Sequence, residues 1–267
     1  KRSISPSLSK SIDTKAILNS GMNTSVVAAN DFDNDGDIDL FVGSRSVPHD
    51  YGNAPSSFIY LNDGTGHFTD KAKVRNPDIA NIGMVTGAVW ADVAGDKEKE
   101  LIIVGQWMAP RVFSFNKDHF DEVKTDYGDT YGWWQTIAAA DLNGDGKEDL
   151  VLGNVGENFY LHPGKTTPVK LFINDFDNNG TVDKIITRTV DGKDATVFLK
   201  RDLTDQIPGL KKQNLKHADF AKKSVQDLFP DEAIRKSTVK DFNYCSSVIA
   251  FSNGGGKFTV QKLPPEV

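Results

Sequence analysis

The chain has 267 residues, of which 38% are hydrophobic and 25% charged, with 23 glycines, 11 prolines and a formal net charge of −6. This length supports one sizeable hydrophobic core or two small ones, and the glycine and proline content favours a turn-rich, all-β protein over a helical one. The acidic balance argues against nucleic acid as a partner.

The N-terminal residues and the single cysteine leave the compartment open. Residues 1–22 show no repeat pattern, so they are taken as an N-terminal extension, and they lack the apolar core of a signal peptide. A mature or trimmed chain would look the same. Cys245 excludes an intrachain disulfide but does not settle the compartment. No apolar run is long enough to span a membrane.

Residues 30–43, NDFDNDGDIDLFVG, carry a dense group of carboxylates. With Asp31 as position 1, Asp33 and Asp35 stand at positions 3 and 5, Gly36 at position 6 and Asp39 at position 9. Alternating oxygen ligands with a glycine at the sharp turn are typical of a short loop that wraps Ca²⁺, which takes more oxygen ligands than Mg²⁺. The stretch therefore predicts a calcium loop, and the alternative is a solvated acidic hairpin that binds no ion.

The same spacing returns in DLNGDGKED at 141–149 and in DFDNNGTVD at 175–183, so about three Ca²⁺ sites are expected. A fourth copy, DVAGDKEKE at 92–100, has lost a ligand at Ala94 and the glycine at Lys97, so we expect little or no metal there. The candidate metal ligands are positions 1, 3, 5, 7 and 9 of the three intact loops: Asp31, Asp33, Asp35, Asp37, Asp39, Asp141, Asn143, Asp145, Lys147, Asp149, Asp175, Asp177, Asn179, Thr181 and Asp183.

An EF-hand is the obvious alternative, and position 12 argues against it. That loop needs a bidentate Glu at position 12 and flanking helices. Here position 12 is Val42, Leu152 or Ile186, and the segments on both sides of each loop are short and rich in β-forming residues. Each acidic loop is therefore predicted to join two strands.

The repeat is longer than the loop and reads strand, acidic loop, strand, turn, strand, Gly-rich turn, strand. A four-stranded unit recurring about every 40 to 60 residues predicts a β-propeller of about four visible blades, possibly part of a larger propeller; a solenoid or sandwich is the alternative. NFYLHPG is expected to be a strand of the third unit. The last unit is expected to end in the hairpin SSVIAFSNGGGKFTVQKL.

The acidic loops, FVGS and NDGTGHF resemble the FG-GAP/VCBS repeats of integrin-α-like β-propellers. GMVTGAVWADV, VGQWMAPRVF, GWWQTIAAADLNGDGKEDLVLGN and PVKLFINDFDNNG resemble a narrower group, bacterial proteins related to the UnbV/ASPIC and cartilage-acidic-protein family. The resemblance runs from about Asn23 onward. It implies Ca²⁺ at the loop positions above, binding rather than catalysis, and an exported location at the cell surface, in the periplasm or outside the cell.

A partly helical insertion is predicted at 191–241, within the last blade of a single propeller-like domain. Phe220, Val225, Leu228 and Phe229 fit a short amphipathic helix, and DEAIRK starts another after Pro230. Residues 200–240 hold ten Lys or Arg against six Asp or Glu. These lysines are expected either to dock an acidic partner or polysaccharide, or to form a solvated face.

The expected function is a calcium-stabilised extracellular or cell-surface adhesion module that binds a protein or carbohydrate ligand. Candidate ligand-binding residues near the inter-strand turns are Arg45, Tyr51, Trp107, Trp133 and Trp134. Two tryptophans exposed on one face would favour a ligand, whereas burial would indicate packing; Trp90 is predicted to lie in the core. A Ca²⁺-dependent polysaccharide lyase using Arg45, His49 and Tyr51 is the alternative, and no catalytic residue is assigned.

Overall fold

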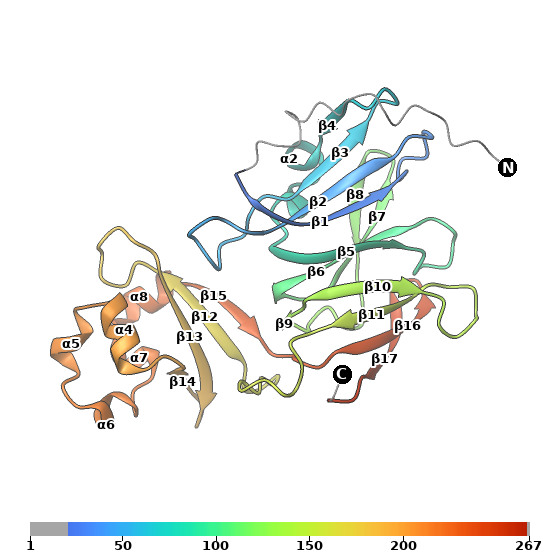
Figure 1. Ribbon diagram of the computed structural model, residues 1–267. Coiled ribbons are helices and arrows are strands. Elements are labelled where there is room, and N and C mark those ends of the chain that lie inside the picture. Colours follow the sequence, from blue (N-terminus) through green and yellow to red (C-terminus); the bar gives the residue numbers. More distant parts are fainter. Residues whose placement is uncertain (1–20, 266–267) are drawn as a thin grey trace.

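The computed structural model describes residues 21–265, which form four antiparallel sheets with a small helical content (Figure 1). The prediction of an all-β chain built from four-stranded units is confirmed. The first sheet has the strand order β1-β2-β3-β4 and is followed by two short helices. Their bounds are β1 (Asn23–Asn30), β2 (Asp39–Ser46), β3 (Phe58–Asn62), β4 (Phe68–Asp70), α2 (Ala72–Arg75) and α3 (Pro77–Ala80).

The second sheet repeats this order as β5-β6-β7-β8, with the short strand β9 paired to β6. The run ELIIVGQWM of β6 is buried at every position, as expected for a strand covered on both faces. The bounds are β5 (Met84–Ala91), β6 (Glu100–Met108), β7 (Arg111–Asn116), β8 (His119–Val123) and β9 (Gly132–Trp133).

The third sheet is assembled from two distant parts of the chain. Its order is β10-β11-β16-β17, so the hairpin expected to close the last unit closes this sheet instead. The reason is the pairing of β16 with β11, in the register Leu150↔Ala250 and Leu152↔Val248. The bounds are β10 (Thr136–Ala140), β11 (Asp149–Gly153), β16 (Val248–Gly254) and β17 (Lys257–Lys262). The predicted strand NFYLHPG is irregular in the structure.

The fourth sheet lies between β11 and β16 in the chain and is called the inserted sheet. Its order, β14-β13-β12-β15, differs from the other three because its last strand pairs with its first. DEAIRK forms α8, as expected. In place of the single amphipathic helix expected before it, the chain forms two short helices, α6 and α7. The bounds are β12 (Val169–Asn174), β13 (Asp183–Val190), β14 (Lys193–Thr196), α4 (Lys200–Gln206), α5 (Leu210–Gln213), α6 (His217–Phe220), α7 (Val225–Leu228), α8 (Asp231–Lys236) and β15 (Thr238–Phe242).

Separate apolar clusters hold these sheets together. Figure 1 shows the first three sheets stacked one after another and the inserted sheet, with its helices, to one side. One cluster lies between the first and second sheets and includes Phe41 and Leu101, and another lies between the second and third and includes Ile102 and Leu150. Burial of Trp90 in the first cluster confirms its predicted place in the core. None of the helices in residues 21–265 is long and apolar enough to cross a membrane.

Two β-bulges link the neighbouring sheets. Ser25 in β1 and Thr86 in β5 are each the extra residue at a register shift, and each stands six residues before the first Asp of its acidic loop. Bulges re-aim a side chain. The Ser25 hydroxyl donates to the carbonyl of Val85 at 2.7 Å, and the Thr86 hydroxyl donates to the carbonyl of Trp134 at 2.7 Å. The same contact is thus made from the first sheet to the second and from the second to the third.

Candidate metal centres and ligand pocket

Each acidic loop joins the first and second strands of its sheet, as the sequence predicted. The loops β1–β2, β5–β6 and β10–β11 lie on the side of the molecule away from the inserted sheet, at the right of Figure 1. The fourth loop joins β12 to β13 within the inserted sheet. The acidic loops, the damaged one included, therefore form a row of three along one edge, and the loop of the inserted sheet lies apart from them.

All four loops share one backbone frame. In each, the backbone N–H at position 6 donates to the carboxylate at position 1, and the position 6 residue has a positive φ, which favours glycine. Lys97 adopts this conformation at φ 78° in the damaged loop, where a side chain strains it. The four bonds are Gly36 to Asp31 at 3.0 Å, Lys97 to Asp92 at 2.8 Å, Gly146 to Asp141 at 3.0 Å and Gly180 to Asp175 at 2.8 Å.

The first loop gathers three carboxylates, those of Asp31, Asp33 and Asp39, with ligand atoms all within 4.8 Å of one another. Asp39 is fully buried; its Oδ1 accepts from the backbone N–H of Asn62 at 2.9 Å, which ties the loop to the end of β3. Asp39 Oδ2 and Asp31 Oδ1 are buried and have no hydrogen-bond partner among the described residues. Burial, reinforced by the neighbouring carboxylates of Asp33 and Asp35, raises the pKa of Asp39 to about 6.

The loop of the inserted sheet gathers Asp175, Asp177 and Asp183 in the same way. Asp183 is buried; its Oδ2 accepts from the N–H of Phe176 at 3.0 Å, and its Oδ1 accepts from the Gln206 side chain in α4 at 3.1 Å. Asp177 Oδ1 is buried without a partner among residues 21–265. In this loop a side chain of helix α4 binds the buried aspartate, whereas in the first sheet a backbone N–H at the end of β3 does so.

In the third intact loop, at 141–149, a lysine side chain of the loop itself pairs with one of the carboxylates. The Lys147 ammonium donates to Asp145 Oδ2 at 2.9 Å and lowers the pKa of that carboxyl. Both oxygens of the buried Asp149 are used, by the N–H groups of Leu142 and Ser252 at 3.0 and 2.9 Å. Within residues 21–265, clusters of three such acidic ligands occur only in the first loop and the loop of the inserted sheet. The two remaining predicted ligands at 141–149, Asp141 and Asn143, accept from loop N–H groups.

In the damaged loop the longer side chain of Glu100 reaches back over the turn. Its Oε2 accepts from the N–H groups of Val93 and Ala94 at 3.0 and 3.1 Å, and the Ser114 hydroxyl donates to Oε1 at 3.2 Å. Both oxygens are thus occupied by the protein, and Ala94 offers no ligand. The expectation of little or no metal in this loop stays a prediction.

The first loop and the loop of the inserted sheet fit a hard divalent cation. An unpartnered buried carboxylate oxygen costs free energy, and a cation among the three carboxylates removes both that cost and their mutual repulsion. Carboxylate and carbonyl oxygens are the ligands that Ca²⁺ prefers. The other predicted ligands, Asp35 and Asp37, and Asn179 and Thr181, lie on the exposed turns of these loops.

The predicted ligand-binding tryptophans lie inside the molecule rather than on one open face. Trp134 is 1% exposed and packs between the second and third sheets. Trp107 is 4% exposed; its indole Nε1 donates to the Tyr51 hydroxyl at 2.9 Å. Trp133 stacks on Phe242 of the inserted sheet with ring centroids 4.8 Å apart. By the exposure criterion these side chains are packing residues, and Trp107 and Trp133 pack against the inserted sheet.

The other two candidate ligand-binding residues, Arg45 and Tyr51, have different surroundings. Arg45 is exposed and borders a small depression at the start of the first strands, with Ser25 and Thr86. The Tyr51 hydroxyl donates to Gln106 Oε1 at 3.3 Å while it accepts from Trp107, and burial raises its pKa. A phenol with a raised pKa is a weaker candidate for the general base of a lyase.

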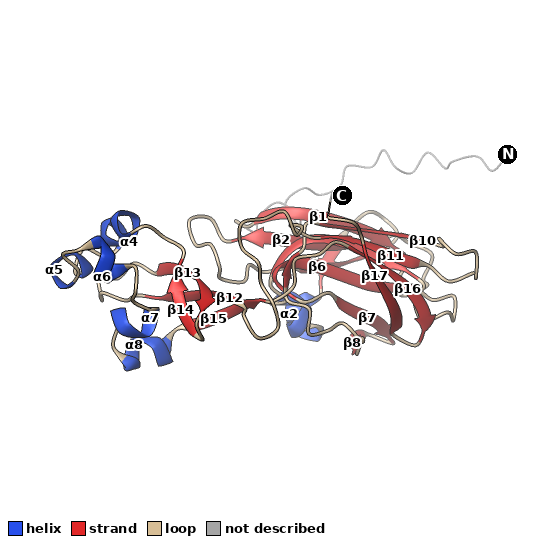
Figure 2. Cartoon of the chain, turned by 90° about the horizontal axis from the view of Figure 1, so that it is seen from below, coloured by secondary structure: helices blue, strands red, loops and turns tan. Residues whose placement is uncertain are grey.

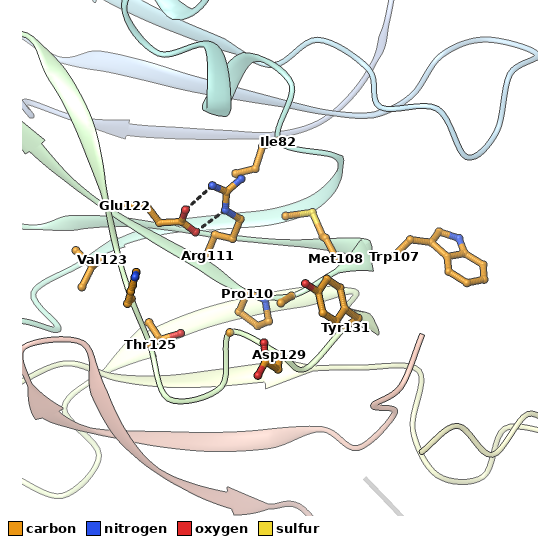
Figure 3. A pocket seen from close by; sticks show the side chains of 13 residues that line it. Ile82, Trp107, Met108, Pro110, Arg111, Glu122, Val123, Thr125, Asp129 and Tyr131 are labelled. Atoms are coloured by element: carbon orange, nitrogen blue, oxygen red, sulfur yellow. Dashed lines mark hydrogen bonds and ion pairs between the residues drawn. The ribbon is translucent and has the colours of Figure 1, made fainter. Parts of the chain in front are cut away.

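Sequence reasoning missed a pocket of about 570 Å³ at the opposite end of the second sheet from its acidic loop (Figure 3). It is lined by Met108 at the end of β6 and by Pro110 in the β6–β7 turn. The loop before β9 supplies Asp129 and Tyr131, and Tyr131 is 39% exposed. Arg111 holds Glu122 through two contacts of 2.6 Å and lowers the pKa of that carboxyl. The run RVFSF, rich in β-forming residues, gives only a strand signal, so the sequence did not distinguish this pair.

Comparison with known proteins identifies FG-GAP-like repeats at residues 31–103 and 92–152. Each match starts at the first Asp of an acidic loop and ends in the second strand of the following sheet. No curated protein matches the chain. The structure and these matches define an all-β protein that carries two FG-GAP-like repeats, and the resemblance expected from the sequence is confirmed at that level.

Proposed function

We propose that the chain is a calcium-stabilised recognition module whose first three sheets form an arc of a β-propeller. The observation that carries the proposal is the pair of acidic clusters with buried, unpartnered carboxylate oxygens, one at Asp31, Asp33 and Asp39 and one at Asp175, Asp177 and Asp183. Ca²⁺ accommodates several carboxylates in a flexible loop, whereas Mg²⁺ prefers few carboxylates and several waters. The ion is structural and pins each loop between its two strands.

The propeller part of the proposal is supported by the repeated strand order and the repeated bulge contact. Three successive sheets have four strands in the same order, and each hydroxyl link points to the next sheet. FG-GAP-like repeats favour the same architecture. The narrower relation to bacterial UnbV/ASPIC and cartilage-acidic proteins remains part of this proposal.

An extracellular or cell-surface setting suits such loops. Calcium-binding modules outside cells have dissociation constants of about 10⁻⁴ to 10⁻³ M, which are occupied where calcium is millimolar. FG-GAP-like repeats are in keeping with export and adhesion. The proposed role is therefore binding of a protein or glycan outside the cell.

The pocket at Arg111, Glu122 and Tyr131 is the proposed recognition site. Its apolar floor, exposed aromatic side chain and few charged groups are the features that orient a small ligand or a loop of a partner. It lies away from the acidic loops, so metal binding and recognition use opposite ends of the second sheet. Tyr131→Ala is expected to abolish binding of any glycan or protein retained by the wild-type chain while leaving its melting temperature near the wild-type value.

Thermal unfolding in EDTA, in Ca²⁺ and in Mg²⁺ tests the calcium proposal. At a free concentration of about 100 Kd, each occupied site adds roughly 2.7 kcal/mol to the free energy of unfolding. The melting temperature is expected to rise strongly in Ca²⁺ and weakly in Mg²⁺. The same thermal unfolding curve in EDTA and in Ca²⁺ would contradict the proposal of structural calcium sites. It would not bear on the proposed arrangement of the sheets.

A further inference from the structure

The helical end of the inserted sheet carries a concentrated positive charge. Residues 199–223 hold seven Lys or Arg against three acidic residues, Asp202, Asp205 and Asp219, and Asp205 pairs with Arg201 at 3.8 Å. Lys211, Lys212, Lys216 and Lys222 are exposed, and none of these four forms an ion pair within residues 21–265. Figure 2 shows α5 and α6 at the far end of the molecule from the three stacked sheets. The cations are therefore free to meet a partner.

Two leucines are exposed at the same place. Leu199 is 72% exposed and Leu215 is 82% exposed. The Lys200 side chain donates to the carbonyl of Leu215 at 2.9 Å, which joins the start of α4 to the segment between α5 and α6. Because Lys200 follows Leu199 directly, this contact brings the two leucine-bearing segments together. We call Leu199, Lys200, Lys211, Lys212, Leu215, Lys216 and Lys222 the basic tip.

The leucines of the basic tip are not needed for the local core. Leu203, Ile207, Leu210 and Phe220 are buried and fill the space between the helices and the sheet. An acidic polysaccharide would pair with the lysines but would offer no apolar layer for exposed leucines. An anionic lipid surface offers both, since phosphate headgroups attract lysines and the boundary below them accepts short apolar side chains.

We infer that the basic tip binds the surface of membranes that contain anionic lipids. The lysines meet the headgroup phosphates, and Leu199 and Leu215 enter the interface without crossing the bilayer. The rest of the chain is acidic, so this end faces the lipid and the three stacked sheets are held away from it. This attachment is independent of calcium binding in the acidic loops.

Vesicle co-sedimentation tests the inference with the full chain. Vesicles of phosphatidylcholine mixed with phosphatidylglycerol should bind the wild-type protein, and vesicles of phosphatidylcholine alone should not. Each lysine near an anionic surface contributes roughly fivefold in affinity. The variant Lys211→Gln/Lys212→Gln/Lys216→Gln should therefore bind about a hundredfold more weakly, and raised salt should release the wild type. The matched control Lys73→Gln/Lys117→Gln/Lys257→Gln changes exposed lysines in α2, in the β7–β8 turn and in β17, all away from the basic tip, and should bind normally.

A second variant separates lipid from other polyanions. Leu199→Ser/Leu215→Ser keeps every charge and should weaken vesicle binding severalfold while leaving retention on a heparin column unchanged. All these side chains are exposed, so the melting temperatures should match the wild type. Equal binding to both vesicle types, normal binding by the triple glutamine variant, or heparin retention without vesicle binding would each overturn the inference.

Discussion

The hydroxyl of Ser25 donates a hydrogen bond to the backbone carbonyl of Val85 at 2.7 Å, across the boundary between the first and second sheets. Thr86, the next residue along, makes the equivalent bond to Trp134 across the following boundary. Both donors sit at β-bulges, where the extra residue turns its side chain out of the sheet. The neighbouring sheets are thus joined by a directional polar contact as well as by apolar packing.

Loss of either hydroxyl should weaken the stack of sheets. Ser25→Ala and Thr86→Val each leave a carbonyl at the sheet boundary without this donor, which costs about 1 to 2 kcal/mol. Urea unfolding measures the change in the free energy of unfolding. Thr136→Val in β10 is the control, since that residue is exposed and should change stability by less than about 0.5 kcal/mol. Equal changes in the free energy of unfolding for the control and the two variants would show that the two hydroxyl hydrogen bonds do not contribute to stability.

Gly52 should prove essential for docking the inserted sheet. A Cβ at this position would lie 2.8 Å from Ile173 Cδ1 and 2.9 Å from Leu171 Cδ2, and Gly52 has φ +99°. Gly52→Ala should therefore cost about 2 to 4 kcal/mol through overpacking and backbone strain combined. Denaturant unfolding and hydrogen exchange in β12 report the loss.

Gly66 provides the matched control for this substitution. It also has a positive φ, of +87°, but a Cβ added there would meet nothing within 4 Å. Gly66→Ala should show only the backbone part of the cost, about 1 kcal/mol. Equal losses at the two glycines would mean that contact with Leu171 and Ile173 does not matter.

Local patterns carried most of what could be predicted. The acidic loops, their place between strands and the alternation of the strands depend on neighbouring residues, and the sequence displays them directly. The pairing of β16 with β11 does not, since it joins segments separated by the whole inserted sheet. The sequence left the role of the tryptophans open for a related reason: Trp107 and Trp133 are covered by the inserted sheet, and this long-range packing is not visible in the local pattern.

Removal of the internal cation should improve calcium binding in the third intact loop. Lys147 occupies Asp145 in this loop, whereas the inserted sheet has Thr181 at the same position. Lys147→Thr should tighten calcium binding there about tenfold, because one positive charge a few ångströms from the ion is removed. Titration of calcium followed by calorimetry measures the affinity. Lys257→Thr, an exposed lysine in β17, is the control, and an unchanged affinity in Lys147→Thr would contradict the assigned role.

Acid should stabilise the metal-free protein and destabilise the calcium form. Burial raises the pKa of Asp39 to about 6, above the ordinary value of 3.8, so the folded chain binds this proton more tightly than the unfolded chain. In EDTA the stabilisation is therefore absent above pH 6, grows as the pH falls through 6 and is complete below the unfolded value. Between pH 7 and 5 the gain should be about 1 kcal/mol, or roughly 2 to 4 °C in melting temperature.

In saturating calcium the sign should reverse over the same range, because protons compete with the ion for the carboxylates. Asp39→Asn is the check: in EDTA it should flatten the rise between pH 7 and 5. The same pH dependence in EDTA for the wild type and Asp39→Asn would show that Asp39 does not have the raised pKa.

Calcium binding counted site by site tests the central claim most directly. Calorimetric titration should show calcium binding to the wild type. The number of bound calcium ions should be one lower in Asp33→Asn and one lower in Asp177→Asn, and it should be unchanged in Asp96→Asn of the damaged loop. Each substitution keeps the side-chain shape and removes one charge. A wild type that takes up no calcium, or a stoichiometry that stays the same in Asp33→Asn and Asp177→Asn, would contradict the assignment of these two loops as calcium centres.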